Sequence, residues 1–291
     1  MLNRESHRRR AVIVLNLALI AFGGLWFAGS GASAAPPRPP KDLRLYIFDC
    51  GTIHARSAEG FSLKNEEVAS TEMSVPCYLI VHPKGTLMWD AGLTPDQAIG
   101  KPTKTGAIQQ GTPLVPQLAA VGYAPGDITY LGLSHFHGDH VSNANLFTKP
   151  TWLVRKIERD HMFSGETVPR TNAADYKLLK DSKTILIDKD EYDVFGDGKV
   201  VIKSTPGHTP GHQALFLKFK KTGPVVLSGD LYHHPEERTL NRLPINEFNK
   251  DQTAASRAEL EVFMKKNGAQ LWIQHDIVGY EKLKKAPAFY E

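Results

Sequence analysis

The sequence predicts a mixed α/β domain in which β-sheets lie in the middle and helices pack outside them. The chain has 291 residues, 41% of them hydrophobic and 23% charged, which is typical of an ordinary globular protein. Apolar runs of the strand type first follow one another and then alternate with polar, helical stretches. Histidines and aspartates come directly after several of these runs, and strand ends on one rim of a sheet converge in space.

The first 41 residues are predicted to precede this domain. Four arginines within residues 4–10 are followed by an apolar run and then by Ala32-Ser33-Ala34, the order of a secretory signal peptide, assigned to residues 1–34. A retained membrane anchor is the alternative, because the apolar run is long enough to span a bilayer. Residues 35–41 form a Pro-rich leader, and residues 42–291 form the domain. Cleavage predicts a periplasmic or secreted protein without stable membrane association.

The elements of the domain are assigned in chain order. Aliphatic and aromatic runs predict strands near residues 43–51, 77–82, 86–92, 128–134, 152–155, 183–188, 200–207, 214–219, 224–230 and 271–276. Helices are expected at 114–121, in a polar stretch near 155–180, and at 251–267, where apolar positions recur among charges. The segment 93–112, rich in Gly, Pro, Thr and Gln, is expected to be a loop.

A dense cluster of metal-binding side chains follows the run at 128–134. His135 and His137 are two positions apart, so in an extended segment they lie on the same face and can chelate one ion. Gly138 lets the backbone turn sharply, so that Asp139 and His140 can reach a second ion. One short segment is therefore predicted to supply two neighbouring metal positions.

The remaining ligands are expected from other strand ends. His208 lies in the glycine-rich turn TPGHTPGH, Asp230 follows Gly229, and His275 precedes Asp276 at the end of the last predicted strand. Imidazoles and carboxylates without thiolates are ordinary ligands of zinc, although Mn, Fe or Co also accept them. His212 is interpreted as a turn residue or one that orients a ligand, and His233 and His234 are left open. The other histidines of the domain are interpreted as structural or surface residues: His54, His82 and His161.

These residues resemble the metallo-β-lactamase fold superfamily, whose H-x-H-x-D-H signature is similar to His135–His140. Within it the chain most resembles the N-acyl-homoserine lactonases. The points of similarity are CYLIVHPKGTLMWDAG, GHTPGHQALF, and intervals of 22 residues from His208 to Asp230 and 45 from Asp230 to His275. The resemblance implies an αββα sandwich, two mixed sheets flanked by helices. It also implies two zinc ions per chain, bridged by Asp230.

The resemblance implies a function as well: hydrolysis of the lactone ring of N-acyl-homoserine lactones, which is quorum quenching. Metal coordination lowers the pKa of water to about 7, and the resulting hydroxide attacks the lactone carbonyl. Asp139 would then carry the proton to the leaving oxygen, and Asp90 would orient a ligand. The family's tyrosine three positions beyond the bridging aspartate is replaced here by His233, with Tyr232 one residue earlier, so either residue or neither assists at the substrate.

Other functions remain open on the sequence alone. Another hydrolase of the same fold, such as a glyoxalase II-like thioesterase, a β-lactamase or a phosphodiesterase, would use the same ligands. A non-catalytic exported zinc-binding protein is the further alternative. The sequence does not predict a nucleic-acid partner. The net charge falls from +4 to +1 without the signal segment, and the rest of the chain has no stripe of lysine and arginine interleaved with aromatic residues.

Several features are left undecided. Phe136, Leu231 and the segment 236–248 are candidates for an acyl-chain pocket by their proximity in the sequence. Cys50 and Cys77 either form a disulfide or stay separate thiols, since geometry decides. The sequence leaves open the acyl-chain preference, the native metal and the oligomeric state, including a homodimer.

Overall fold

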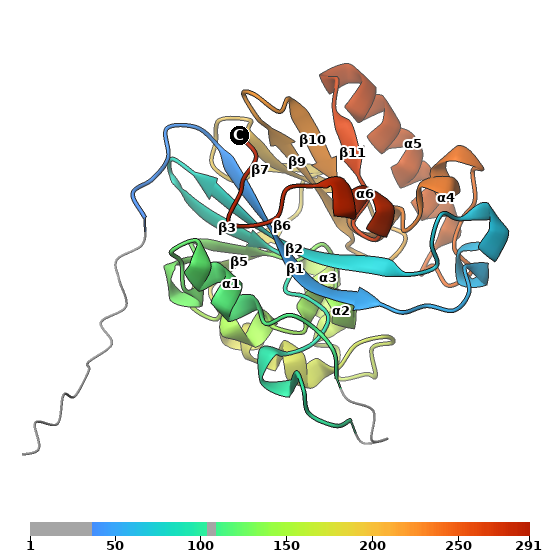
Figure 1. Cartoon of the computed structure of the whole chain (residues 1–291), viewed down its shortest axis with the longest axis horizontal. Coiled ribbons are helices and arrows are strands. Elements are labelled where there is room, and N and C mark those ends of the chain that lie inside the picture. The colour runs from blue at the N-terminus through green and yellow to red at the C-terminus, as the bar shows by residue number, and fades with distance from the viewer. Residues whose placement is uncertain (1–36, 104–108) are drawn as a thin grey trace, which may run out of the picture. The chain divides into compact units, whose positions relative to one another are not determined.

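Two mixed β-sheets form the centre of the structure, a computed structural model that describes residues 37–103 and 109–291. The order in the first sheet is β1 (Arg44–Ile53), β2 (Met73–His82), β3 (Gly85–Trp89), β4 (Tyr130–Gly132), β5 (Thr151–Arg155) and β6 (Thr184–Ile187). The order in the second is β11 (Gln270–Trp272), β10 (Pro224–Leu227), β9 (Gln213–Lys218), β8 (Val200–Ser204) and β7 (Glu191–Asp193) (Figure 1). The strands from β3 to β6 run parallel, as do β10 and β11; the other neighbouring strands are antiparallel.

Helices cover the outer face of each sheet. The α-helices are α1 (Leu114–Ala120), α2 (Gly138–Val141), α3 (Lys156–Met162), α4 (Pro235–Thr239), α5 (Lys250–Asn267) and α6 (Ile277–Lys282). In Figure 1, α1, α2 and α3 lie on the first sheet and α5 lies on the second. The 3-10 helices are η1 (Glu59–Phe61), η2 (Asn65–Glu67), η3 (Asp96–Ala98), η4 (Pro125–Asp127), η5 (Ala144–Leu146), η6 (Ala173–Asp175), η7 (Lys177–Asp181) and η8 (Gly229–Leu231).

The alternation of side chains along the strands explains this layering. In β2, Tyr78 and Ile80 point to the core between the sheets, where Leu215 of β9 is also buried. Cys77 and Leu79 point the other way, to a core shared with Leu118 of α1 and other outer residues. Both faces of β2 are therefore buried, and the strand is apolar along nearly its whole length. A third core lies between the second sheet and α5.

The helix predicted at 251–267 is confirmed as α5, and its ends follow from its sequence. The Asn249 side chain accepts a hydrogen bond from the Gln252 N–H, and Gly268 ends the helix in the left-handed conformation. The helix predicted near 155–180 is wrong in its extent, because only α3 is α-helical there. Gly165 adopts a φ of +87° and Pro169 follows, so the helix stops and two 3-10 turns come later. Strand β7 was not predicted from the sequence.

Cys50 and Cys77 form a disulfide that joins β1 to β2, with their Cα atoms 5.8 Å apart. The described residues belong to one compact unit. The predicted signal peptide and the first two residues of the predicted leader lie outside the described residues. Among the helices of residues 37–103 and 109–291, none has both the length and the apolar content needed to cross a membrane.

Candidate metal centre

The predicted ligands lie at the ends of strands from both sheets. His135 and His137 follow β4, and Asp139 and His140 lie in α2 directly after them. From the second sheet come His208, in the turn between β8 and β9, Asp230, in η8 after β10, and His275, after β11. The structure brings all seven of these side chains together. Segments that are far apart in the sequence meet here because the two sheets place their strand ends at one edge of the sandwich.

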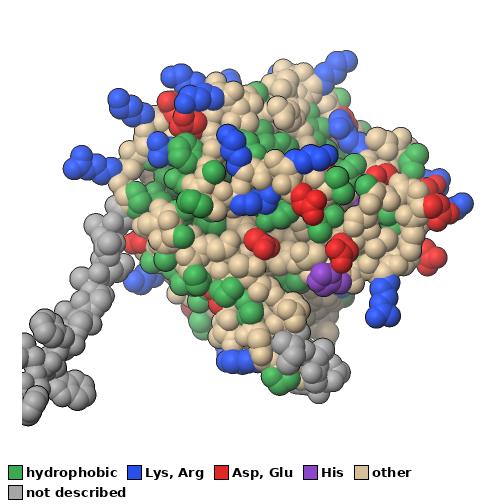
Figure 2. Space-filling model, in the orientation of Figure 1, with side chains coloured by type: hydrophobic (Ala, Val, Ile, Leu, Met, Phe, Trp, Pro, Cys, Tyr) green, Lys and Arg blue, Asp and Glu red, His purple; other side chains and the backbone are tan. Residues whose placement is uncertain are grey.

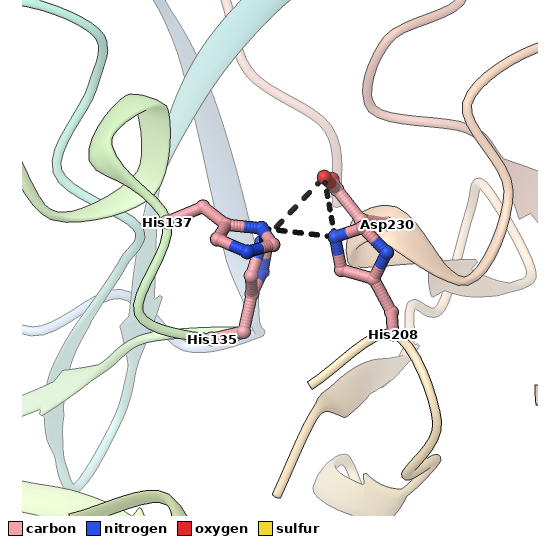
Figure 3. Close-up of side chains that lie close together, drawn as sticks. All are labelled: His135, His137, His208 and Asp230. Atoms are coloured by element: carbon pink, nitrogen blue, oxygen red, sulfur yellow. Dashed lines mark hydrogen bonds and ion pairs between the residues drawn. The ribbon is translucent and has the colours of Figure 1, made fainter. Parts of the chain in front are cut away.

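Four of these residues form the first group of donor atoms (Figure 3). His137 Nδ1 lies 2.7 Å from His135 Nε2 and 3.0 Å from His208 Nε2. Asp230 Oδ2 lies 3.5 Å from His135 Nε2 and 3.3 Å from His208 Nε2. Three imidazole nitrogens and one carboxylate oxygen therefore face a common point, and all four side chains are buried.

The second group consists of Asp139, His140, His275 and the other oxygen of Asp230. Asp230 Oδ1 lies 3.1 Å from His140 Nε2 and 3.0 Å from His275 Nε2. Asp139 Oδ2 lies 3.3 Å from each of the same two nitrogens. Because Asp230 directs one oxygen to each group, a carboxylate bridge between two ions is the arrangement that fits its position.

The donor atoms fit metal ions in spacing and chemistry. Tetrahedral zinc with bonds of about 2.0–2.1 Å places neighbouring ligand atoms about 3.3 Å apart. The separations given above run from 2.7 to 3.5 Å in the first group and from 3.0 to 3.3 Å in the second. His140 Nε2 and Asp230 Oδ1 are buried without a hydrogen-bond partner, which a cation between the ligands would supply.

Burial and neighbouring charge give His135 and Asp230 the protonation states that metal ligands need. Burial, with the nearby imidazole of His140, lowers the pKa of His135 well below its ordinary value, so the ring is neutral. Burial alone would raise the pKa of Asp230, but the surrounding histidines, His140 and His275 first, outweigh it and hold the pKa well below the ordinary value. Neutral imidazole and ionised carboxylate are the forms that bind metal.

The outer ring nitrogens of the ligands are held by hydrogen-bonding groups. His140 Nδ1 lies 3.0 Å from Asp90 Oδ2, and His208 Nδ1 lies 2.9 Å from Glu247 Oε1. His275 Nδ1 lies 2.8 Å from the Ser74 carbonyl oxygen. Such partners fix the orientation of each ring and leave the inward nitrogen free to bind a metal. Asp90 thus occupies the place predicted for a residue that orients a ligand.

The sequence profile of the metallo-beta-lactamase superfamily matches residues 70–269 of this chain. The chain belongs to this superfamily. N-acyl homoserine lactonase AttM of Rhizobium radiobacter is 30% identical over 267 residues, which cover 86% of this chain and 99% of that protein. The chain is a metal-dependent hydrolase of the metallo-β-lactamase superfamily.

Solved structures of this superfamily share the fold. The crystal structure of a quorum-quenching N-acyl homoserine lactone lactonase is 25% identical with a TM-score of 0.71, covering 87% of this chain and 100% of that one. The structure of AidC, a dizinc quorum-quenching lactonase, is 19% identical with a TM-score of 0.65, covering 85% and 92%. These likenesses confirm the αββα sandwich that the sequence predicts.

Tyr232 and His233 lie on opposite sides of the backbone at this metallo-β-lactamase centre. Of the two residues left open from the sequence, Tyr232 packs away from the ligands: its hydroxyl lies 3.4 Å from Glu261, and its ring packs under Arg257 in the core beside α5. His233 Nε2 lies 3.3 Å from Asp230 Oδ2. Its Nδ1 lies 3.3 Å from Glu237 Oε1, within ion-pair distance.

His212 lies behind the centre rather than in it. Its Nε2 accepts a hydrogen bond of 2.9 Å from the backbone N–H of Asp230. Burial, with His208 nearby, lowers the pKa of His212 to about 3, so the ring stays neutral and can accept that bond. His212 therefore positions the bridging aspartate, as the sequence predicted for a residue that orients a ligand.

A cavity of about 650 Å³ opens beside the first group of ligands. It is lined by Phe136, His137, His161, Glu166, Thr167, Pro169, Arg170, His208, Asn246, Glu247 and Phe248. Phe136 and the end of the segment 236–248 line it as expected, whereas Leu231 is buried in the core beside α5. His161, interpreted as structural from the sequence, stacks on Phe136 with ring centroids 5.2 Å apart and lines the same wall.

Three residues around the centre were missed by reasoning from the sequence. Glu247 holds His208, and Arg170 donates hydrogen bonds to His137 and His208. Glu158 of α3 accepts bonds from the backbone N–H groups of Phe136 and Gly211. Each acts across a large sequence separation, and no local motif marks it.

On the face shown in Figure 2, lysines and arginines are interspersed with acidic side chains.

Proposed function

We propose that this protein is a dinuclear zinc hydrolase that opens the lactone ring of N-acyl-homoserine lactones. The observation that carries the proposal is the bridging position of Asp230, whose two oxygens face two complete groups of ligands. The 30% identity to a named N-acyl homoserine lactonase over nearly all of that protein supports the substrate class. The fold is able to hold two zinc ions, since AidC, a dizinc lactonase, shares it.

The residues present fit two metal positions of different character. His135, His137 and His208 would hold one ion, His140, Asp139 and His275 the other, and Asp230 both. When bound, such ions lower the pKa of water to about 7 and polarise a carbonyl oxygen. Two carboxylates against two divalent cations leave the centre with net positive charge, which favours negative charge that develops on the substrate.

Two side chains at the centre are suited to act on the substrate, one by proton transfer and one by a hydrogen bond. Asp139 is about one-sixth exposed, whereas His140 and His275 beside it are almost wholly buried. The carboxylate is therefore the most accessible of these three side chains and is suited to carry a proton to the leaving ring oxygen. His233, held by Glu237, can direct Nε2 at a substrate oxygen in the role that the family gives to a tyrosine.

The adjoining cavity suits an acyl chain. Phe136, His161 and Phe248 form an aromatic wall, with His161 in contact with both phenylalanines. Aromatic rings supply apolar surface on which methylene groups are buried at about 0.8 kcal/mol each. Because the cavity reaches His137 and His208, a chain lying in it places its attached ring at the centre.

A turnover panel on zinc-loaded protein tests the function. The substrates are N-acyl-homoserine lactones of short and long chain, a thioester, a β-lactam and a phosphodiester, with lactone opening followed through proton release. The proposal expects lactone turnover to exceed that of each other class. Turnover of the thioester without any lactone would replace the proposal with a glyoxalase II-like activity. Less than about one metal ion per chain after gentle purification would favour a non-catalytic protein.

We also propose that the protein is exported to the periplasm or beyond. The order of arginines, apolar run and A-x-A in residues 1–34 supports a cleaved signal peptide. The Cys50–Cys77 disulfide supports an oxidising compartment. Fractionation of the source cell with N-terminal sequencing tests this, and a chain that keeps residue 1 in the cytoplasmic fraction contradicts it.

A further inference from the structure

Arg170 is the one lysine or arginine among the described residues that line the cavity beside the metal centre. It lies in the segment between α3 and η6, and its backbone carbonyl accepts a hydrogen bond of 2.9 Å from the N–H of Gly138. The position of Arg170 is thereby tied to the segment that carries the ligands His137 and Asp139.

The backbone of Arg170 is in an unfavourable conformation. Its φ of +56° lies in the left-handed region, which costs a residue with a Cβ free energy and is found at binding sites more often than elsewhere. This conformation accompanies a guanidinium group that points to the centre. Nη2 lies 2.8 Å from His137 Nδ1 and 3.0 Å from His208 Nε2, and Nε lies 3.2 Å from His137 Nε2.

The two hydrogen bonds of Nη2 are to atoms that the metal requires. His137 Nδ1 and His208 Nε2 belong to the first group of ligands, and their lone pairs cannot accept a hydrogen bond and bind a cation at once. With the ions bound, Nη2 would lose both acceptors, whereas Nε keeps His137 Nε2. With cations bound, the guanidinium would stand beside a centre of like charge, and an anion between the two would stabilise this arrangement.

We propose that Arg170 binds the carboxylate that ring opening creates, an inference that rests on the proposed function. Hydrolysis adds one water across the ring ester. The bond between the lactone carbonyl carbon and the ring oxygen breaks. The ring oxygen gains a hydrogen and becomes a hydroxyl group, and the carbonyl carbon gains the OH of water and becomes a carboxylic acid. At neutral pH the acid releases its proton, and the resulting carboxylate matches the planar fork of a guanidinium. Arg170 is thus the residue that recognises the product and, before it, the charge that develops on the same oxygens.

A pair of ligands that differ in one charge tests this inference. The probes are N-hexanoyl-homoserine, which carries the carboxylate, and its carboxamide, which has the same shape without the charge. Calorimetry measures the binding of both to metal-loaded wild type, Arg170→Gln, Arg170→Met and Arg170→Lys. Arg238→Gln is the matched control, since Arg238 pairs with Glu261 and lies outside the residues that line this cavity. Elemental analysis and thermal unfolding establish that each variant keeps its metal and its fold.

Wild type is expected to prefer the carboxylate over the carboxamide, and Arg170→Gln is expected to reduce that preference about tenfold or more. Arg170→Lys should restore part of it, and Arg238→Gln should leave it unchanged. Arg170→Met provides a second neutral variant where Arg170→Gln loses metal. An unchanged preference in the neutral variants overturns the inference while lactone turnover by wild type still upholds the function. If wild type does not turn over lactones but its preference for the carboxylate over the carboxamide still depends on Arg170, the proposed function is refuted and the carboxylate site is retained.

Discussion

At the scale of single residues, the carboxylate of Asp230 belongs to both groups of donor atoms. Each oxygen has two imidazole nitrogens of a different group within 3.0–3.5 Å. An aspartate at this position serves both groups equally, whereas an amide has one oxygen and one nitrogen that donates hydrogen bonds. The geometry therefore makes the two metal positions depend on one side chain.

Asp230→Asn should lose at least half of the bound metal and nearly all turnover together, because one group loses its carboxylate oxygen and the bridge is broken. Elemental analysis of the purified variant measures the metal, and the lactone assay measures turnover. Asp197→Asn is the matched control, since Asp197 pairs with His82 outside the cluster. Turnover at the wild-type rate by Asp230→Asn would remove Asp230 from the centre.

Glu247 acts on the metal through His208. Burial alone would raise its pKa, but hydrogen bonds from His208 and Thr253 outweigh burial and lower the pKa to about 2, so the carboxylate stays ionised. Glu247→Gln should weaken the affinity for metal about 10–100-fold, the usual effect of removing such a partner. Competition with a chromophoric chelator measures this affinity. Glu191→Gln, which removes an exposed carboxylate paired with Lys203, should have no effect, and equal affinities in both variants would exclude Glu247 from this role.

At the scale of elements, the turn between β8 and β9 places His208 by packing against the first turn of α5. Gly207 has a φ of +135°, and a Cβ there would lie 2.3 Å from the backbone nitrogen of Thr253. The N–H of Asn249, which caps α5, also donates a 2.9 Å bond to the Gly207 carbonyl. The glycine thus lets the helix and the ligand-bearing turn come into contact.

Gly207→Ala should destabilise the fold by more than about 2 kcal/mol, because strain at positive φ adds to a clash with backbone. It should also lower metal content, since His208 must move with the turn. Gly223→Ala separates the two causes: it has a φ of +82° but nothing within 4 Å of the added Cβ. Urea unfolding of both variants measures the difference, and equal losses would show that the contact with α5 is unimportant.

The elements show how far the sequence determines the fold and the site. His135, His137, Asp139 and His140 lie in one motif, and the apolar runs before His208, Asp230 and His275 mark strand ends, so the ligands were accessible to sequence reasoning. The orientation of Tyr232 and His233 was not, because it depends on whether each side chain packs against α5 or faces the ligands. Arg170 and Glu158 were missed because their partners are distant in the sequence. His137 lies 33 positions from Arg170, and Phe136 lies 22 positions from Glu158.

At the scale of the whole molecule, Glu158 links the halves of the sandwich. Its carboxylate accepts hydrogen bonds from Phe136 N–H on the first sheet's side, at 3.0 Å, and from Gly211 N–H on the second's, at 2.7 Å. Thr209 donates a third bond of 2.9 Å. Glu158 therefore holds two loops at a fixed separation, the one that carries His135 and His137 and the one that carries His208. It does so through residues that are not themselves metal ligands.

The pKa of Glu158 predicts how stability changes with pH. Burial raises its pKa from 4.5 to about 7, although the three hydrogen bonds oppose the change. Between these values the unfolded chain releases the proton and the folded chain keeps it, so rising pH favours unfolding, by about 3 kcal/mol in total. For metal-free protein, the stability of wild type relative to Glu158→Gln should fall by about that amount between pH 4.5 and pH 7. Urea unfolding at both values measures it, and parallel pH profiles would contradict the assignment.

The division of ligands between the two sheets has a kinetic consequence. Each group takes side chains from both halves of the sandwich, so a bound ion would leave only after its bonds to ligands of both halves have broken. Exchange of bound metal for a labelled isotope should then be slow while the contacts between the halves are intact, and its rate would report how often these ligands detach together.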